Sequence, residues 1–163
     1  MRPPPYRSLL LLALLAAATP ADGKEADAGA DRDWAAKGRN DMAVFLGATA
    51  VRGDLGESVG LDYEYRVTRR FGVGAALEYT GAAFRELLYA VSFDWHPWRE
   101  MKLYLAPGGQ TDVTEGTAAW VVRFGIEYGF DVGRGLEIAP ALSIDHLSDE
   151  TAVVIGVGLG RSF

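Results

Sequence analysis

Apolar residues alternate with polar or small residues over most of the chain, beginning near Asp41. A period of two is typical of β-strands, because successive side chains of a strand point to opposite faces. Gly, Asp and Pro interrupt the alternation every ten to fifteen residues, which indicates antiparallel strands joined by hairpins. Eight strands are predicted, at 41–50, 58–66, 71–79, 85–95, 101–109, 117–131, 136–146 and 151–163.

The two faces of these strands differ in composition. One face carries large aliphatic and aromatic residues, and the other carries Gly, Ala and Ser with scattered charges. Small residues suit the narrow interior of an eight-stranded barrel, whereas glycine would only weaken a strand facing solvent. We therefore expect a transmembrane barrel with its apolar face outward, closed by pairing of the first and last strands because lipid tolerates no unpaired edge. The expected luminal polar network is Asp62, Glu64, Arg66, Glu78, Asp94, Arg123, Glu127 and Asp145.

Aromatic residues cluster near the turns that should lie on the same side as the N-terminus. This placement is typical of the aromatic girdle at a membrane interface. The expected girdle is Tyr65, Phe71, Trp95, Trp98, Phe130 and Phe163. A soluble barrel with the faces inverted is the alternative, since alternation alone fits both.

The N-terminal segment is typical of a secretory signal. Arg2 and Arg7 precede an uncharged apolar run from 9 to 18, which is too short to span a bilayer as a helix and ends in small residues. We expect a signal peptide at 1–21, a flexible periplasmic tail at 22–40 and an outer-membrane barrel at 41–163. Removal of the signal leaves 14 basic against 22 acidic residues, a formal charge of −8 that disfavours nucleic acid as a partner. The chain has no cysteine, so disulfides and thiolate chemistry are excluded.

The barrel segment resembles the small outer-membrane β-barrel proteins of the OmpA, OmpX and OmpW type, often called porin family proteins. The resemblance lies in the segments FGVGAALEY, VVRFGIEYGFDVG, LEIAPALSIDHLSDE and VVIGVGLGRSF. It implies an all-β, eight-stranded up-and-down barrel in the cell outer membrane of a Gram-negative envelope. Phe163 looks like the terminal aromatic that the barrel-assembly machinery reads in such proteins, although Arg161 stands where a second apolar residue is usual.

Candidate catalytic chemistry is confined to one short match. His146 and Ser148 near Asp145 resemble part of the motif of PagL-type lipid A deacylases, in which an imidazole activates a hydroxyl. A turn rich in Ser and Asp explains the same residues without catalysis, and the acids follow the serine at once, unlike that family. The two histidines, His96 and His146, fall at opposite barrel ends, so no metal site or cofactor is expected. His96, in the sequence HPW before the fifth strand, is expected to belong to an interfacial turn.

The sequence favours a non-enzymatic, monomeric barrel with a structural or surface-interaction role, whose partners are outer-membrane lipids and, during biogenesis, the assembly machinery. The first alternative is passage of small hydrophobic molecules, and the less favoured one is a lipid A deacylase-like esterase. Pro107 and Pro140 lie inside predicted strands, where each removes a donor from the ladder, and we expect bulges or early strand ends there. A gap in the wall at either proline would favour passage.

Overall fold

The structure, a computed structural model, describes residues 38–81, 84–148 and 150–163. The predicted signal peptide, 1–21, and the tail up to residue 37 lie outside the described residues. Among the described residues, no helix is long and apolar enough to cross a bilayer. The strands are β1 Asn40–Val51, β2 Asp54–Arg66, β3 Phe71–Thr80, β4 Glu86–Trp98, β5 Met101–Asp112, β6 Ala118–Tyr128, β7 Phe130–Gly133, β8 Leu136–Leu147 and β9 Thr151–Ser162.

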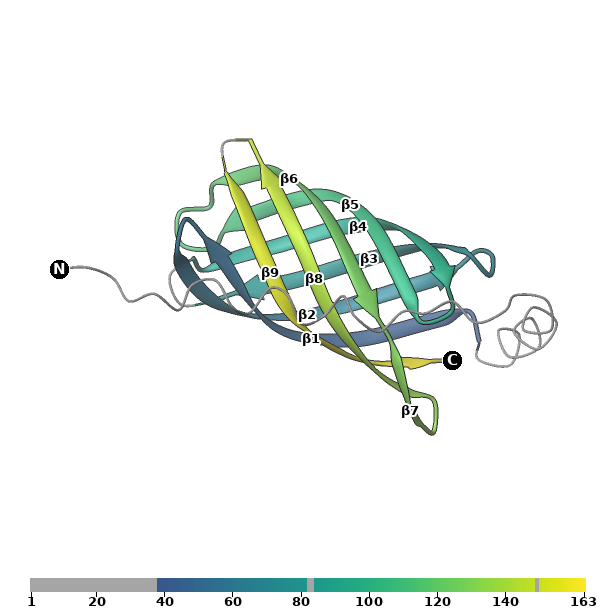
Figure 1. Cartoon of the computed structure of the whole chain (residues 1–163). Coiled ribbons are helices and arrows are strands. Elements are labelled where there is room, and N and C mark those ends of the chain that lie inside the picture. The colour runs from purple at the N-terminus through teal and green to yellow at the C-terminus, as the bar shows by residue number, and fades with distance from the viewer. Residues whose placement is uncertain (1–37, 82–83, 149) are drawn as a thin grey trace.

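The strands form a closed antiparallel barrel (Figure 1). Neighbours along the chain pair from β1 to β6, β6 pairs with β8, β8 with β9, and β9 with β1. The short β7 continues β6 beyond Gly129 and pairs only with β8, so the wall contains eight strands. The predicted all-β, eight-stranded up-and-down barrel is confirmed.

Several strand boundaries differ from the prediction, and two of these differences have a local explanation. β2 begins at Asp54 and not at 58, because Arg52 and Gly53 adopt φ values of 49° and 102° and form a two-residue turn that lets β1 and β2 pair up to its edge. The predicted strand 117–131 is split at Gly129, where a Cβ would meet the Glu137 carboxylate at 2.1 Å. A side chain at this position would therefore displace the Glu137 carboxylate.

The expectation of bulges or early strand ends at the two prolines is wrong. β5 runs through Pro107, which pairs with Val122, and β8 runs through Pro140, which pairs with Val157. Next to Pro107, β4 and β5 are not paired between the pairs Ala90–Gly108 and Phe93–Leu105. The pairing on either side of this interruption has the same register. The second strand beside each proline therefore keeps the wall continuous.

A bulge occurs elsewhere, at the end of β4. The register shifts between the pairs Trp95–Leu103 and Trp98–Met101, so three residues of β4 span two of β5. Strict alternation would turn Trp98 inward, but the bulge leaves both Trp95 and Trp98 exposed with His96 buried between them.

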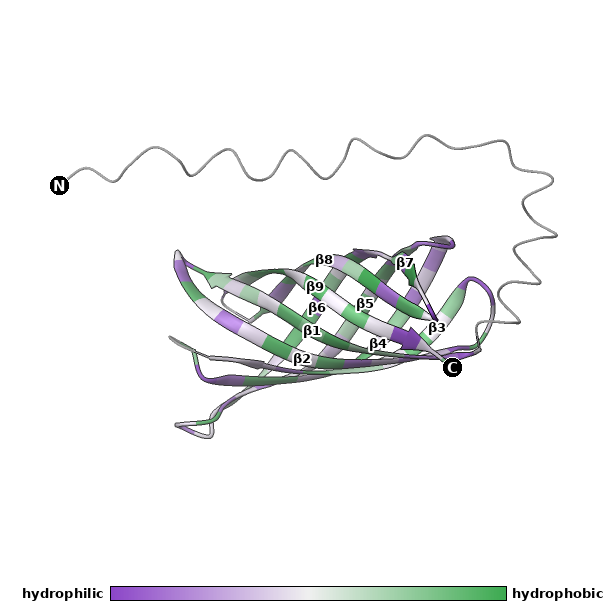
Figure 2. Ribbon diagram, turned by 90° about the horizontal axis from the view of Figure 1, so that it is seen from below, coloured by the Kyte–Doolittle hydropathy of each residue, from purple (hydrophilic) through white to green (hydrophobic). Residues whose placement is uncertain are grey.

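Hydropathy alternates along every long strand, as the green and purple bands in Figure 2 show. The large aliphatic and aromatic side chains are on the exposed outer surface, and the buried residues point into the lumen. In the lumen, Leu88, Ala90, Ala106, Val121 and Leu147 pack into one apolar cluster. Phe45, Val154 and a set of polar residues occupy other parts of the interior.

The two barrel ends have different connections. The terminus end carries Asn40, Ser162 and the turns 67–70, 99–100 and 134–135, whereas the opposite end carries the connections 52–53, 81–85, 113–117 and 148–150. All of these connections are short, between two and five residues long.

Candidate functional site

A buried ion-pair network crosses the middle of the lumen. Arg123 on β6 donates from Nε and Nη2 to the two oxygens of Asp145 at 2.6 and 2.7 Å, and from Nη1 to Glu78 Oε2 at 2.6 Å. Arg123 and Asp145 are paired residues of neighbouring strands, whereas Glu78 reaches them from β3. The three residues are 5%, 2% and 4% exposed, so each charge depends on the others for solvation. We call Arg123, Glu78 and Asp145 the central clamp.

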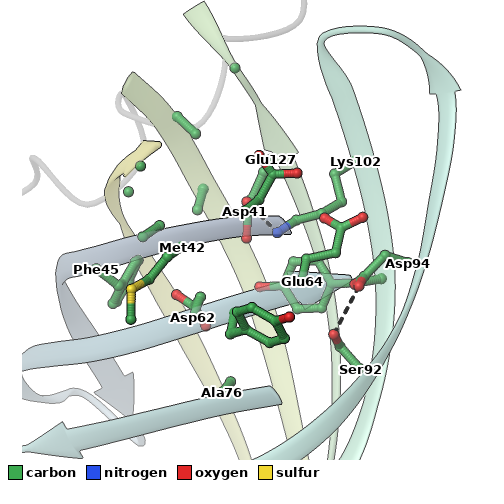
Figure 3. Close-up of a pocket in the computed structure, with 18 of the residues that line it drawn as sticks. Asp41, Met42, Phe45, Asp62, Glu64, Ala76, Ser92, Asp94, Lys102 and Glu127 are labelled. Atoms are coloured by element: carbon green, nitrogen blue, oxygen red, sulfur yellow. Dashed lines mark hydrogen bonds and ion pairs between the residues drawn. The ribbon is translucent and has the colours of Figure 1, made fainter. Parts of the chain in front are cut away.

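A polar cavity lies between the clamp and the terminus end. Its volume is about 90 Å³, room for several waters at roughly 10–15 Å³ each. Lys102 reaches from β5 into this space among the carboxylates of Glu127, Glu64 and Asp94 (Figure 3), and its Nζ lies 2.8 Å from Glu127 Oε2. Ser92 donates to Asp94 Oδ2 at 3.0 Å on the cavity wall.

A second group of charges lies at the terminus end of the cavity. His96 Nε2 and Glu64 Oε1 are 2.7 Å apart, and both residues are buried. Arg66 Nε lies 3.4 Å from Glu64 Oε1 and 3.3 Å from Asp41 Oδ2. The expectation that His96 belongs to an interfacial turn is wrong, because β4 extends to Trp98 and carries His96 into the lumen.

The opposite half of the lumen is closed by apolar packing and neutral hydroxyls. Thr49, Ser58 and Thr80 form a chain with Oγ distances of 2.7 and 3.2 Å across β1, β2 and β3. The apolar cluster that includes Leu88 and Val121 fills the neighbouring side, with Val121 fully buried. Together with the clamp, these groups leave no wide aqueous path among the described residues.

The structure brings the eight sequence-predicted luminal residues into the barrel interior. Seven line the polar cavity, and the eighth, Asp145, holds Arg123 beside it. The sequence prediction omitted Lys102, His96 and Asp41, which also face this interior. Lys102 could have been found, since Lys102 and Tyr104 alternate with Met101, Leu103 and Leu105 in the predicted strand.

The six residues of the expected girdle are exposed, and each lies at or near the terminus end. Phe71 and Trp95 are paired across β3 and β4, and Trp98 is 60% exposed beyond the bulge. The backbone of Phe163 exchanges hydrogen bonds with that of Asn40 at 2.8 and 3.1 Å, which ties the two ends of the described chain together while the Phe163 ring is exposed.

The weak catalytic candidates lie at the opposite end. His146 is near the end of β8, and its Nδ1 is 3.5 Å from Thr151 Oγ1, at the outer limit of a hydrogen bond. Ser148 follows in the connection to β9. Within the described residues, no group of three His, Cys, Asp or Glu side chains is placed to hold a metal ion.

Comparison with known proteins identifies the fold. No family model matches the chain, and no curated protein matches it. A designed transmembrane β-barrel covers 76% of this chain and 97% of its own, at 14% identity and a TM-score of 0.53. The fold is therefore that of the small outer-membrane β-barrels.

A natural protein with this fold is Ail, the attachment invasion locus protein of Yersinia pestis. Its crystal structure aligns at 16% identity with a TM-score of 0.52, covering 76% of this chain and 96% of Ail. Its structure in a phospholipid bilayer nanodisc aligns at 15% identity and 0.53, covering 77% and 99%. At these identities the similarity concerns the fold alone.

Proposed function

We propose that the protein is an integral outer-membrane barrel with a structural role in the envelope and no catalytic activity. The carrying observation is the inverted distribution of side chains. Large apolar residues cover the outside of all eight wall strands, while charged groups are buried inside. Water would disfavour so extensive an apolar surface, whereas hydrocarbon accepts it where the backbone polar groups are paired, as they are in a closed ladder.

The short connections at the opposite end support a structural role over an adhesive one. The longest of these connections spans five residues and must return to the barrel, so it rises roughly 9 Å at most, at about 3.5 Å per residue. A surface-interaction role would have to use the barrel rim itself.

The closed lumen and wall disfavour passage of small molecules. The clamp, the apolar cluster and the hydroxyl chain occupy the interior, and each proline is paired with one neighbouring strand, Pro107 through Val122 and Pro140 through Val157. A transported hydrophobic molecule would need a rearrangement of these groups.

Heat-modifiable migration tests the proposal. Protein from isolated outer membranes is run on a denaturing gel with and without boiling. A band that moves on boiling is expected, because a closed ladder resists detergent until heated. Recovery in the soluble periplasm with no shift would refute the membrane assignment and favour the soluble barrel. Liposomes containing the shifted form should exclude small sugars in a swelling assay, and rapid swelling would contradict a structural role.

A further inference from the structure

Arginine side chains gather in a cleft at the terminus end of the barrel. The cleft has a volume of about 70 Å³, well above the roughly 10–15 Å³ that one water needs. Its walls come from the turn 67–70, the end of β4 with the turn after it, and the ends of β1, β8 and β9. The ionic side chains lining it, His96 aside, are Arg66, Arg69, Arg70, Arg99, Asp41 and Glu137.

The charge of this arginine cleft is unusual for the chain. Four arginines against two carboxylates give it a formal excess of two positive charges, although the whole protein carries −6. The connections of the opposite end, with the residues next to them, instead carry six acids against two arginines: Asp54, Glu86, Asp112, Glu115, Asp149 and Glu150 against Arg52 and Arg85. Guanidinium groups held close together repel one another, so an anion bound between them is stabilised.

The turn that carries Arg70 is held in place before any ligand binds. The Thr68 hydroxyl accepts hydrogen bonds from the backbone N–H groups of Arg70 and Phe71 at 3.2 and 3.0 Å. The His96 N–H donates to the Arg70 carbonyl at 2.8 Å, which fixes the turn to β4. These bonds use no guanidinium, so the Arg70 side chain can bind a ligand without loss of the turn.

The cleft continues onto the lipid-facing wall. Trp98 lines it and is 60% exposed, and Arg70 directly precedes the outward Phe71, which is paired with Trp95. A lipid whose acyl chains lie along Phe71 and Trp95 would place its phosphate at the arginines. Guanidinium binds phosphate through paired, charge-assisted hydrogen bonds.

We propose that the arginine cleft binds the phosphate of an anionic phospholipid headgroup in the leaflet at the terminus end. This inference rests on the proposed function, since it requires a barrel embedded in a bilayer. It adds a lipid site that holds the termini at one interface.

Quenching of Trp98 by brominated lipid tests this proposal. A variant with Trp34, Trp95 and Trp120 replaced by Phe retains Trp98 as its single tryptophan, and it is folded into bilayers of phosphatidylcholine and phosphatidylglycerol with one or the other brominated. The ratio of the two quenching curves gives the preference of the site for the anionic lipid. We expect a severalfold preference that weakens in high salt.

Substitution of Arg70 should lower that preference about fivefold in R70Q, and R70K should retain most of it. The matched control is R134Q, which removes an exposed arginine of the same end outside the cleft. If R134Q and R70Q lower the preference for anionic lipid equally, the preference comes from the overall positive charge of this end and not from the cleft. That result would overturn the proposal.

The remaining outcomes separate the two proposals. A protein that no brominated lipid quenches, and that shows no heat shift, is not embedded, so the proposed function itself fails. An embedded protein that both brominated lipids quench equally refutes the cleft alone. Inorganic phosphate is added to barrels in pure phosphatidylcholine, where no response is expected. A saturable change in Trp98 fluorescence that R70Q abolishes, without preference for anionic lipid, would assign the cleft to a soluble anion and refute the lipid.

Discussion

Removal of the central cation should destabilise the barrel strongly. In R123M, Glu78 and Asp145 remain in the lumen without the guanidinium that donates to both at 2.6 to 2.7 Å. Loss of one partner from a buried ion pair costs about 3–5 kcal/mol, because the remaining charge is unsolvated. With a urea m-value of about 1–3 kcal/mol/M, the unfolding midpoint should fall by at least about 1 M.

Urea titration of the barrel in lipid bilayers measures this loss, with tryptophan fluorescence and heat-modifiable migration as two probes of the folded fraction. A second variant, R123M with Glu78→Leu and Asp145→Leu, should recover most of the stability, because it removes the stranded charges with the cation. The control is R52M, which breaks the exposed 3.4 Å contact between Arg52 and Glu150 and should change the free energy of unfolding by about 0–1 kcal/mol.

Two results would refute this reasoning. If R123M loses no more free energy of unfolding than R52M, water solvates the carboxylates of the central clamp and their burial costs little. If the triple variant is as unstable as R123M, the stability lost in R123M comes from the volume of the arginine side chain and not from its charge.

Three further predictions concern packing, assembly and catalysis. At Gly125 a Cβ would lie 2.2 Å from the Tyr104 ring, so G125V should lower the free energy of unfolding by about 1–3 kcal/mol. Tyr104→Ala in the same chain should recover part of this loss. An unchanged urea midpoint in G125V would contradict the close packing of Gly125 against Tyr104. F163A should reduce the heat-modifiable fraction in isolated outer membranes without moving the urea midpoint of the refolded protein, because the ring is exposed; a shifted midpoint would make Phe163 a stability residue. Expression of the protein should leave lipid A acylation unchanged, and deacylation that His146→Ala or Ser148→Ala abolishes would establish the esterase.

The strands could be predicted because residue type alternates with the environment of each face, outside and inside the barrel. In β3 and β9 most outward residues are large and most inward ones small, apart from Ala75, Glu78 and Val154, and burial in the structure follows that alternation. Lipid outside and a narrow lumen inside impose opposite demands on the two faces, so few other folds fit the pattern.

The partners within the lumen could not be predicted in the same way. Arg123 and Asp145 face each other across neighbouring strands, but Glu78 joins them from β3, and its approach depends on the register of every strand between. Phe45 shows the same dependence, since its ring fits inside because Gly47 and the distant Gly156 leave room for it. Alternation gives the face of a residue and says nothing of its neighbours across the barrel.

His96 was misplaced because a local signal competed with a longer pattern. Pro97 and the aromatic after it are typical of a turn, whereas the alternation from Asp94 continues to an inward His96. The bulge at the end of β4 reconciles the two signals, because β4 stays paired beyond His96 and Trp98 still turns outward.

The pairing of β1 with β9 has a consequence for the order of folding. The paired residues Asp41 and Ser162 lie at the two ends of the barrel segment, so the ring cannot close until the last strand has been synthesised. Contacts between residues so distant in sequence form slowly, and until then β1 and β8 each expose an unpaired edge that can join another chain. The time between synthesis of β1 and closure is therefore when this chain is most open to aggregation, and a slower synthesis of β9 should raise aggregation while leaving the finished barrel unchanged.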